Sequence, residues 1–255
     1  MAFTLYMAGQ TDTGRNRAHN EDAISWDQGH GLALLADGMG GHNAGDVASR
    51  VCLESLNGYL LPKLAKSLRL KANKGMSRHG TLVKRAIMQA NKAICEAAMA
   101  NAEYRGMGTT LVALLLHDDQ AVVAHVGDSR IYRLRAGELS QLTEDHSLVQ
   151  EMLNRGMMSE DEVDGSGYTH VVTRAMGADS KVLADIQDVE VKPGDVFLLC
   201  SDGLSDLIAD DAIADTLVAA SGNWQRACQH LIDLANHAGG TDNISVVLVA
   251  VGPPR

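Results

Sequence analysis

Short acidic motifs stand at the boundaries of apolar runs along the whole chain, and this placement limits what the chain can fold into. The motifs are Asn20-Glu21-Asp22, Asp37-Gly38-Met39-Gly40-Gly41-His42, Ser201-Asp202-Gly203 and Thr241-Asp242-Asn243. Asp37 and Asp202 follow an apolar run, whereas Asp22 and Asp242 precede one. If the strands that leave and enter are antiparallel, these acids meet at one rim of a sheet. We therefore expect residues 1–255 to form a single domain, because positions 20 to 243 must converge.

Carboxylates gathered at one rim repel one another unless cations lie among them. Oxygen ligands with almost no Cys or His favour Mg²⁺ or Mn²⁺ over zinc. We expect two ions bridged by Asp37, with Gly38 offering its carbonyl oxygen because glycine has no Cβ in the way. Asp202 and Asp242 complete the ligands of one ion, and Glu21 serves the other, through water.

Three further groups of residues are expected to act beside these two ions. Asp128 and Asp206 are candidates for a third, weaker ion site. The planar guanidinium of Arg17 is suited to hold two oxygens of a phosphoryl group. His42, with an ordinary pKa near ~6.5, is suited to protonate a leaving alkoxide. Taken alone, Arg17 would be interpreted as a surface arginine in a loop and His42 as a structural histidine, so both depend on the acids around them for their proposed roles.

Several familiar routes to phosphate-ester hydrolysis are absent from the sequence. It contains no Cys-x5-Arg, no Asp-x-Asp-x-Thr and no Gly-Asp-x-His-Gly, and no Gly-Lys-Ser/Thr follows the glycine-rich motif at Asp37. No covalent nucleophile suggests itself. A water molecule activated by metal ions is therefore the expected attacking group.

The charge of the chain bears on its partners. Its net charge of −10 argues against nucleic acid, which needs a basic surface. Nine basic residues and no acidic one nevertheless lie between Lys63 and Lys92. This segment is either a solvated helix face with a loop or a docking patch for an acidic partner. No apolar run is long enough to span a bilayer, and the start lacks a signal-peptide pattern, so we expect a cytoplasmic protein without a membrane partner.

The pattern of apolar residues predicts a layered α/β fold. Strands are expected at residues 3–8, 23–26, 31–36, 109–116, 121–126, 130–134, 186–191, 196–200 and 244–251. Helices are expected at residues 44–61, 82–102, 145–155, 210–219 and 223–237, with a loop at 71–80. The strands 186–191 and 196–200 are predicted to form a hairpin across Lys192-Pro193-Gly194-Asp195. Two packed sheets covered by helices on both faces satisfy this order of elements.

Eight motifs in family order make the chain resemble the metal-dependent protein phosphatases, the type 2C serine/threonine phosphatases, in their compact bacterial form. The motifs are Arg17-Ala-His-Asn-Glu-Asp22, Ala36-Asp-Gly-Met-Gly-Gly-His42, Gly108-Thr-Thr110, Val126-Gly-Asp-Ser-Arg130, Leu142-Thr-Glu-Asp-His-Ser147, Val172-Thr-Arg-Ala-Met-Gly177, Ser201-Asp-Gly-Leu-Ser-Asp206 and Gly240-Thr-Asp-Asn-Ile-Ser245.

The resemblance implies a central antiparallel β-sandwich flanked by helix pairs, with the metals at one end and a flap, residues 143–184, beside the active site. It implies hydrolysis of phosphoserine and phosphothreonine with Mn²⁺ or Mg²⁺, in opposition to a bacterial serine/threonine kinase. By position it gives each candidate residue the same role: metal ligands Glu21, Asp37, Gly38, Asp128, Asp202, Asp206 and Asp242, phosphate-binding Arg17 and general acid His42. The chain departs from its bacterial relatives at Asp164-Gly-Ser-Gly-Tyr168-Thr-His170, which bears on substrate preference.

The sequence thus favours a protein serine/threonine phosphatase, expected to act as a monomer on phosphorylated proteins. One alternative is a catalytically silent member of the family that serves as a phosphoprotein-binding regulatory module, although no ligand carboxylate is missing. A second alternative is a scaffold in which the basic segment 63–92 dominates.

Overall fold

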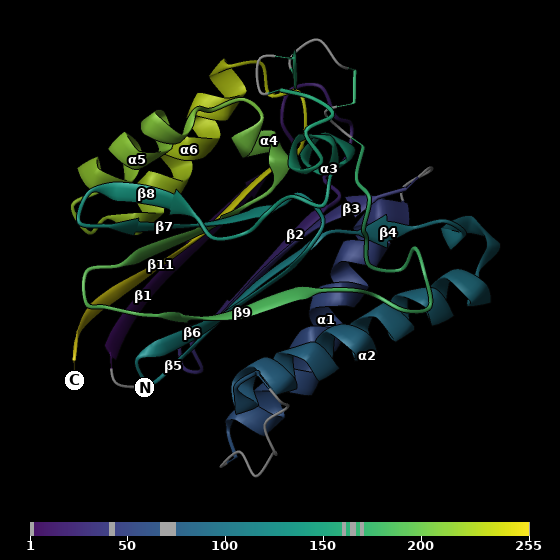
Figure 1. Cartoon of the computed structure of the whole chain (residues 1–255), viewed down its shortest axis with the longest axis horizontal. Helices are drawn as coiled ribbons and strands as arrows, with labels where there is room; N and C mark the ends of the chain where they lie inside the picture. The colour runs from purple at the N-terminus through teal and green to yellow at the C-terminus, as the bar shows by residue number, and fades with distance from the viewer. Residues whose placement is uncertain are drawn as a thin grey trace.

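Two antiparallel sheets pack face to face between two layers of helices in the computed structural model of this chain (Figure 1). The structure describes residues 3–40, 44–66, 75–159, 162–163, 167–168 and 171–254. The first sheet has the order β1-β11-β10-β7-β8, and the second has the order β2-β3-β5-β6-β9 with β4 paired to β3. This arrangement confirms the predicted sandwich.

Most of the predicted strands are present with small shifts in their ends. The first sheet consists of β1 (Phe3–Asp12), β7 (Arg130–Arg135), β8 (Glu138–Gln141), β10 (Val196–Cys200) and β11 (Ile244–Pro254). The second consists of β2 (Asp22–Asp27), β3 (Leu32–Met39), β4 (Gly108–Thr109), β5 (Leu111–His117), β6 (Gln120–Val126) and β9 (Asp185–Glu190). Strand β8 was not predicted, since its four residues contain one apolar side chain.

Helices cover the outer face of each sheet. The second sheet lies against α1 (Ala44–Leu64) and α2 (Arg78–Ala100), and the first against α5 (Asp210–Ala219) and α6 (Trp224–His237) (Figure 1). The shorter helices are α3 (Leu148–Asn154), α4 (Asp202–Ser205) and the 3₁₀ turn η1 (Ala102–Tyr104). Among the described helices, none has the length and apolar character needed to cross a lipid bilayer.

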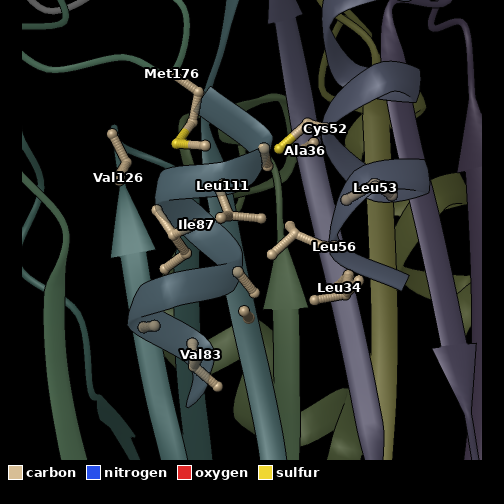
Figure 2. Packing of buried hydrophobic residues seen from close by; sticks show 14 of the residues in the cluster. Leu34, Ala36, Cys52, Leu53, Leu56, Val83, Ile87, Leu111, Val126 and Met176 are labelled. Carbon is tan, nitrogen blue, oxygen red and sulfur yellow. The ribbon is translucent and has the colours of Figure 1, made fainter. Parts of the chain in front are cut away.

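Three buried layers of aliphatic side chains hold these elements together. Along β5, Leu111 and Leu115 pack beneath α1 and α2, whereas Val112 and Leu114 face the other sheet. Successive side chains of a strand point to opposite faces, so a strand covered on both faces becomes a continuous apolar run. Figure 2 shows the helix side of this packing, where Leu56 of α1 and Ile87 of α2 meet the sheet.

The predicted hairpin between residues 186–191 and 196–200 is wrong. Strand β9 pairs with β6 at the edge of the second sheet, whereas β10 lies between β11 and β7 in the first. The turn between them therefore crosses from one sheet to the other. The cause is burial: all five side chains of β10 are buried, which requires a central position, whereas the polar and largely exposed β9 suits an edge.

Helix α2 begins before its predicted start at residue 82. Ser77 caps it, because its side chain accepts a hydrogen bond from the Gly80 backbone N–H at 2.9 Å. Part of the predicted loop 71–80 is therefore helical, and residues 71–74 of that loop lie outside the described residues.

The turn between β9 and β10 is fixed by an ion pair between the buried Asp195 and the partly exposed Arg135. The Asp195 side chain is fully buried and accepts hydrogen bonds from Arg135 Nε at 2.7 Å and Arg135 Nη2 at 2.6 Å. It also accepts one from the Lys192 backbone N–H at 2.8 Å. The carboxylate thus joins the end of β7 to the crossing between the sheets.

Asp195→Ala should lower the free energy of unfolding by about 2 kcal/mol, because the Lys192 N–H and part of Arg135 lose a buried acceptor. Urea denaturation followed by circular dichroism measures this change. The control is Lys92→Ala, which removes an exposed pair with Glu96 and should change stability by less than about 0.5 kcal/mol. Equal effects of the two substitutions would contradict the role given to Asp195.

Candidate metal centre

The acidic motifs meet at one end of the sandwich, where the rims of both sheets come together. Within the second sheet, Asp22 of β2 is in register with Asp37 of β3. Across the sheets, Ser201 Oγ donates a hydrogen bond to Asp22 Oδ2 at 2.9 Å. The same hydroxyl accepts one from the backbone N–H of Ser245, in β11, at 3.0 Å. Antiparallel pairing has thus brought the four motifs to one rim, as the sequence predicted.

A cavity of about 690 Å³ opens at this rim. Arg17 and all seven predicted metal ligands line it, namely Glu21, Asp37, Gly38, Asp128, Asp202, Asp206 and Asp242. His42 lies outside the described residues. The structure therefore gathers one set of oxygen donors from five separate parts of the chain, with a cationic side chain beside them.

The backbone around Asp37 leaves little freedom for this residue. Its N–H donates to Thr110 Oγ1 at 3.0 Å, and its carbonyl accepts from the Thr110 N–H and the Thr109 hydroxyl, both at 2.8 Å. At the next position, a Cβ on Gly38 would lie 2.2 Å from the Gly45 carbonyl oxygen and 2.6 Å from that of Glu21. This close approach of three backbone segments requires glycine.

Asn243 fixes the loop that carries Arg17 and Glu21. Its Oδ1 accepts a hydrogen bond from the Glu21 backbone N–H at 2.8 Å. Its Nδ2 donates to the carbonyls of Thr13 at 2.9 Å and His19 at 3.0 Å. This role of Asn243 was not predicted from the sequence, where its place beside Asp242 was the available signal.

A pair of hydroxyl groups connects the two sides of the acidic set. Thr110 Oγ1 and Ser129 Oγ lie 2.7 Å apart. Thr110 also accepts from the Asp37 N–H, and Ser129 directly follows Asp128. The position of Asp128 is therefore tied to that of Asp37 through Thr110 and Ser129, two short side chains whose role was not predicted from the motifs that contain them.

Burial and mutual repulsion shape the protonation of these acids. Burial raises the pKa of Asp22 to about 6 and that of Asp128 to about 6. Burial, followed by the neighbouring carboxylates, raises the pKa of Asp37 and of Asp202 well above the usual range. These groups would favour the protonated form unless cations balanced their charge.

Two buried oxygens also point to missing cationic partners. Asp22 Oδ1 and Asp202 Oδ1 have no hydrogen-bond partner among the described residues. A buried carboxylate oxygen without a partner is costly, and Asp202 belongs to a cavity lined by five further carboxylates, a setting that fits hard divalent cations with oxygen ligands. The donor set therefore fits Mn²⁺ or Mg²⁺.

Arg17 lies at the mouth of this cavity, with its side chain about half exposed. Its Nη2 donates to Asp242 Oδ2 at 2.6 Å. The contact orients a guanidinium toward the acidic set, and the side chain has further N–H groups for an incoming anion. The sequence predicted both residues at the site but not their pairing with each other.

Comparison with known proteins agrees with this geometry. The sequence profile of the family described as Protein phosphatase 2C matches residues 10–241. The chain is 37% identical to the "Serine/threonine phosphatase stp" of Listeria welshimeri over 94% of this chain and 93% of that protein.

Solved structures of similar proteins share the whole fold. The serine/threonine phosphatase PstP/Ppp of Mycobacterium tuberculosis superposes with a TM-score of 0.86 and 34% identity, covering 97% of this chain and 99% of that one. The PstP catalytic domain in complex with two manganese ions gives a TM-score of 0.83 and 34% identity, covering 97% and 98%. The chain therefore belongs to the protein phosphatase 2C family of serine/threonine phosphatases.

Proposed function

We propose that this chain removes phosphate from phosphoserine and phosphothreonine in proteins, using two Mn²⁺ or Mg²⁺ ions and a third, weaker one. The observation that carries the proposal is the single cavity lined by Arg17 and seven oxygen-donor residues. The similar PstP domain with two manganese ions supports it. No ligand carboxylate is replaced in the sequence, which weighs against a catalytically silent regulatory module.

The acidic side chains would hold the ions in two groups. Asp37, Gly38 and Glu21, with Asp202 and Asp242, would hold the pair, and Asp128 with Asp206 would hold the third ion. When bound, such ions stabilise negative charge on phosphoryl oxygens and lower the pKa of water at the site. The protein contributes a rigid arrangement, because the backbone of Asp37 is held at both its N–H and its carbonyl.

The remaining residues act on the substrate. Arg17 would bind and orient the phosphoryl oxygens from the cavity mouth. Val171 and Val172 of the flap form part of the cavity wall and would contact the substrate chain. His42 would give a proton to the departing serine or threonine oxygen.

The same features bear on the oligomeric state, the location and the substrates of the enzyme. We infer that residues 1–255 act as one domain and as a monomer, in the cytoplasm. The substrates would be phosphorylated proteins made by a cognate serine/threonine kinase. The net charge of −10 disfavours nucleic acid as a partner.

Asp37→Asn should lower phosphate release from a phosphothreonine peptide by at least about a hundred-fold, because the cavity loses its central anionic ligand. Malachite-green detection of phosphate in the presence of Mn²⁺ measures this loss. Asp233→Asn removes an exposed carboxylate from α6 and should leave the rate within about two-fold. Full activity in the Asp37 variant would refute the proposed centre.

His42→Ala should separate two classes of substrate. Turnover of a phosphoserine peptide should fall about a hundred-fold, because an alkoxide leaving group needs a proton. Turnover of para-nitrophenyl phosphate should change little, since nitrophenolate leaves without one. His230→Ala, on the exposed face of α6, is the control. Equal losses on both substrates would remove His42 from the acid role.

The stabilisation that divalent ions give this protein should depend on pH. The raised pKa values of Asp22 and Asp128 mean that the folded state binds more protons than the unfolded state between about pH 4 and pH 6. Between about pH 5 and pH 7 these two acids therefore destabilise the chelated protein as pH rises, whereas the lowered pKa values of His79, His117, His125 and His146 act in the opposite direction. Because the histidines contribute with and without metal, the rise in melting temperature on adding Mn²⁺ should be larger at pH 7 than at pH 5, by about 5 °C or more. Thermal denaturation in EDTA and in Mn²⁺ at both pH values measures this difference. A rise that is equal at the two pH values, or larger at pH 5, would contradict the assignment.

A further inference from the structure

His146 stands near the start of the flap, shortly after β8 of the first sheet, and it joins several segments. Its backbone N–H donates to the Gly127 carbonyl at 3.0 Å, and its carbonyl accepts from the Thr173 N–H at 2.7 Å. Its ring Nδ1 lies 3.1 Å from the Gly127 N–H, and its Nε2 lies 3.1 Å from Asp185 Oδ2. One buried residue thus connects both arms of the flap base with the Asp128 loop and the start of β9.

These contacts define the tautomer of the ring. The Gly127 N–H can only donate, so Nδ1 must be the acceptor and the ring proton sits on Nε2, which donates to Asp185. Burial, together with the nearby Arg174 cation, lowers the pKa of His146 and keeps the ring neutral. The neutral ring is required, because a protonated Nδ1 could not accept from Gly127.

His146, His125 and Asp185 are close enough to resemble a metal site, but their geometry does not suit metal binding. It suits hydrogen bonds that hold the base of the flap in place, and we call the contacts of His146 with Gly127 and Asp185 the latch. The His125 and His146 rings are stacked, with centroids 4.5 Å apart and planes inclined by 21°. Rings so nearly parallel cannot both direct an in-plane lone pair at one ion. The guanidinium of Arg174 also lies 3.2 Å from His146 Nε2 and 3.4 Å from Asp185 Oδ1, and its charge opposes a cation.

The latch acts on both sides of the cavity. Gly127 has a φ of +103°, and a Cβ there would lie 2.6 Å from the Thr110 side chain, so the turn before Asp128 is tight. On the flap side, Ser147 forms a β-bridge with Val172, a residue of the cavity wall. His146 therefore lies between an acid of the proposed third ion site and the wall that faces the substrate.

We propose that His146 is a positioning residue, which holds the Asp128 loop through Gly127 and so maintains the weakest of the cation sites. The inference rests on the proposed function, because it takes Asp128 as a ligand. It extends that function to a side chain that does not line the cavity and contacts neither ion nor substrate.

The test is a calorimetric titration of Mn²⁺ into chelator-treated protein. His146→Leu keeps the bulk of the ring but removes the acceptor for the Gly127 N–H. We expect it to weaken the weakest Mn²⁺ binding about five-fold, the equivalent of one hydrogen bond, while the tighter binding stays within about two-fold. His146→Asn places a carbonyl oxygen near the position of Nδ1 and should restore the weakest affinity to within about two-fold of the wild type. Unchanged weak binding in the leucine variant, or no recovery with asparagine, would overturn the proposal.

Two controls separate this inference from the assignment on which it rests. Asp128→Asn should abolish the weakest binding; if it does not, the ligand assignment is wrong and the role of His146 falls with it. If it does, and His146→Leu has no effect, only the role of His146 is refuted. His79→Leu removes a ring from the other stacked histidine pair, His79 with His117, and should leave all Mn²⁺ affinities within about two-fold.

A variant that fails to fold still leaves a decisive comparison. If His146→Leu is insoluble, His146→Asn and His146→Gln should be compared by the same titration. Asparagine reaches toward Gly127, whereas the longer glutamine reaches toward Asp185. Weak Mn²⁺ binding should be near normal with asparagine and reduced with glutamine, and the reverse order would refute the proposal.

Discussion

The repulsion among buried carboxylates at one end of the sandwich is the interaction on which the rest of this structure depends. Asp22, Asp37 and Asp202 are half-buried beside neighbours of the same charge, and burial together with these charges raises their pKa values. A polypeptide does not gather such groups for stability. The aliphatic layers between and outside the sheets must supply the stabilisation that keeps the rim assembled when the charges are unbalanced.

Small polar side chains, more than the acids themselves, hold the geometry of the rim. Asn243 fixes the Arg17 loop, Ser201 joins the two sheets, and Thr110 with Ser129 links Asp37 to Asp128. Each provides donors and acceptors over a short distance and loses little side-chain entropy on burial. This explains why most acids of the motifs have a Thr, Ser or Asn beside them. The acids offer oxygen atoms, and their polar neighbours determine where those atoms point.

The limits of prediction follow from what each signal measures. Strand boundaries were predictable because a strand buried on both faces, such as β5, is apolar throughout and its acids stand at the ends. The partner of a strand is a different matter. The turn residues Lys192-Pro193-Gly194-Asp195 suit a hairpin as well as a change of sheet. The signs of the change are the contrast between the polar β9 and the apolar β10, and the pair of Asp195 with Arg135, 60 residues away. The early start of α2 depended on one cap at Ser77, and capping decides single turns that periodicity cannot resolve.

The same limit applies to the candidate metal centre, where the acids could be predicted but the residues that position them could not. Its acids could be predicted from the sequence because charge at the end of an apolar run is conspicuous, and every acid predicted as a metal ligand lines the cavity. The hydrogen bonds that connect these acids could not be predicted. Asn243 bonds a residue more than 200 positions away, and His146 bonds one about 20 positions away. In both cases the partner is a backbone N–H, which every residue except proline has, so the side-chain sequence does not reveal it. His42 stays a prediction, as it lies outside the described residues.

The predicted flap, residues 143–184, has a base that is fixed at both ends. Its first arm is held by Arg130, which makes a three-contact ion pair with Asp145 beside His146. Its second arm is held at Met176, which exchanges two backbone hydrogen bonds with Thr109 of β4 and buries its side chain against α1 and α2 (Figure 2). Because both arms end in the core, changes in the intervening segment 164–170 need not move the acids. Selection can therefore vary the surface that meets a phosphorylated protein while the cavity that would hold the ions stays the same.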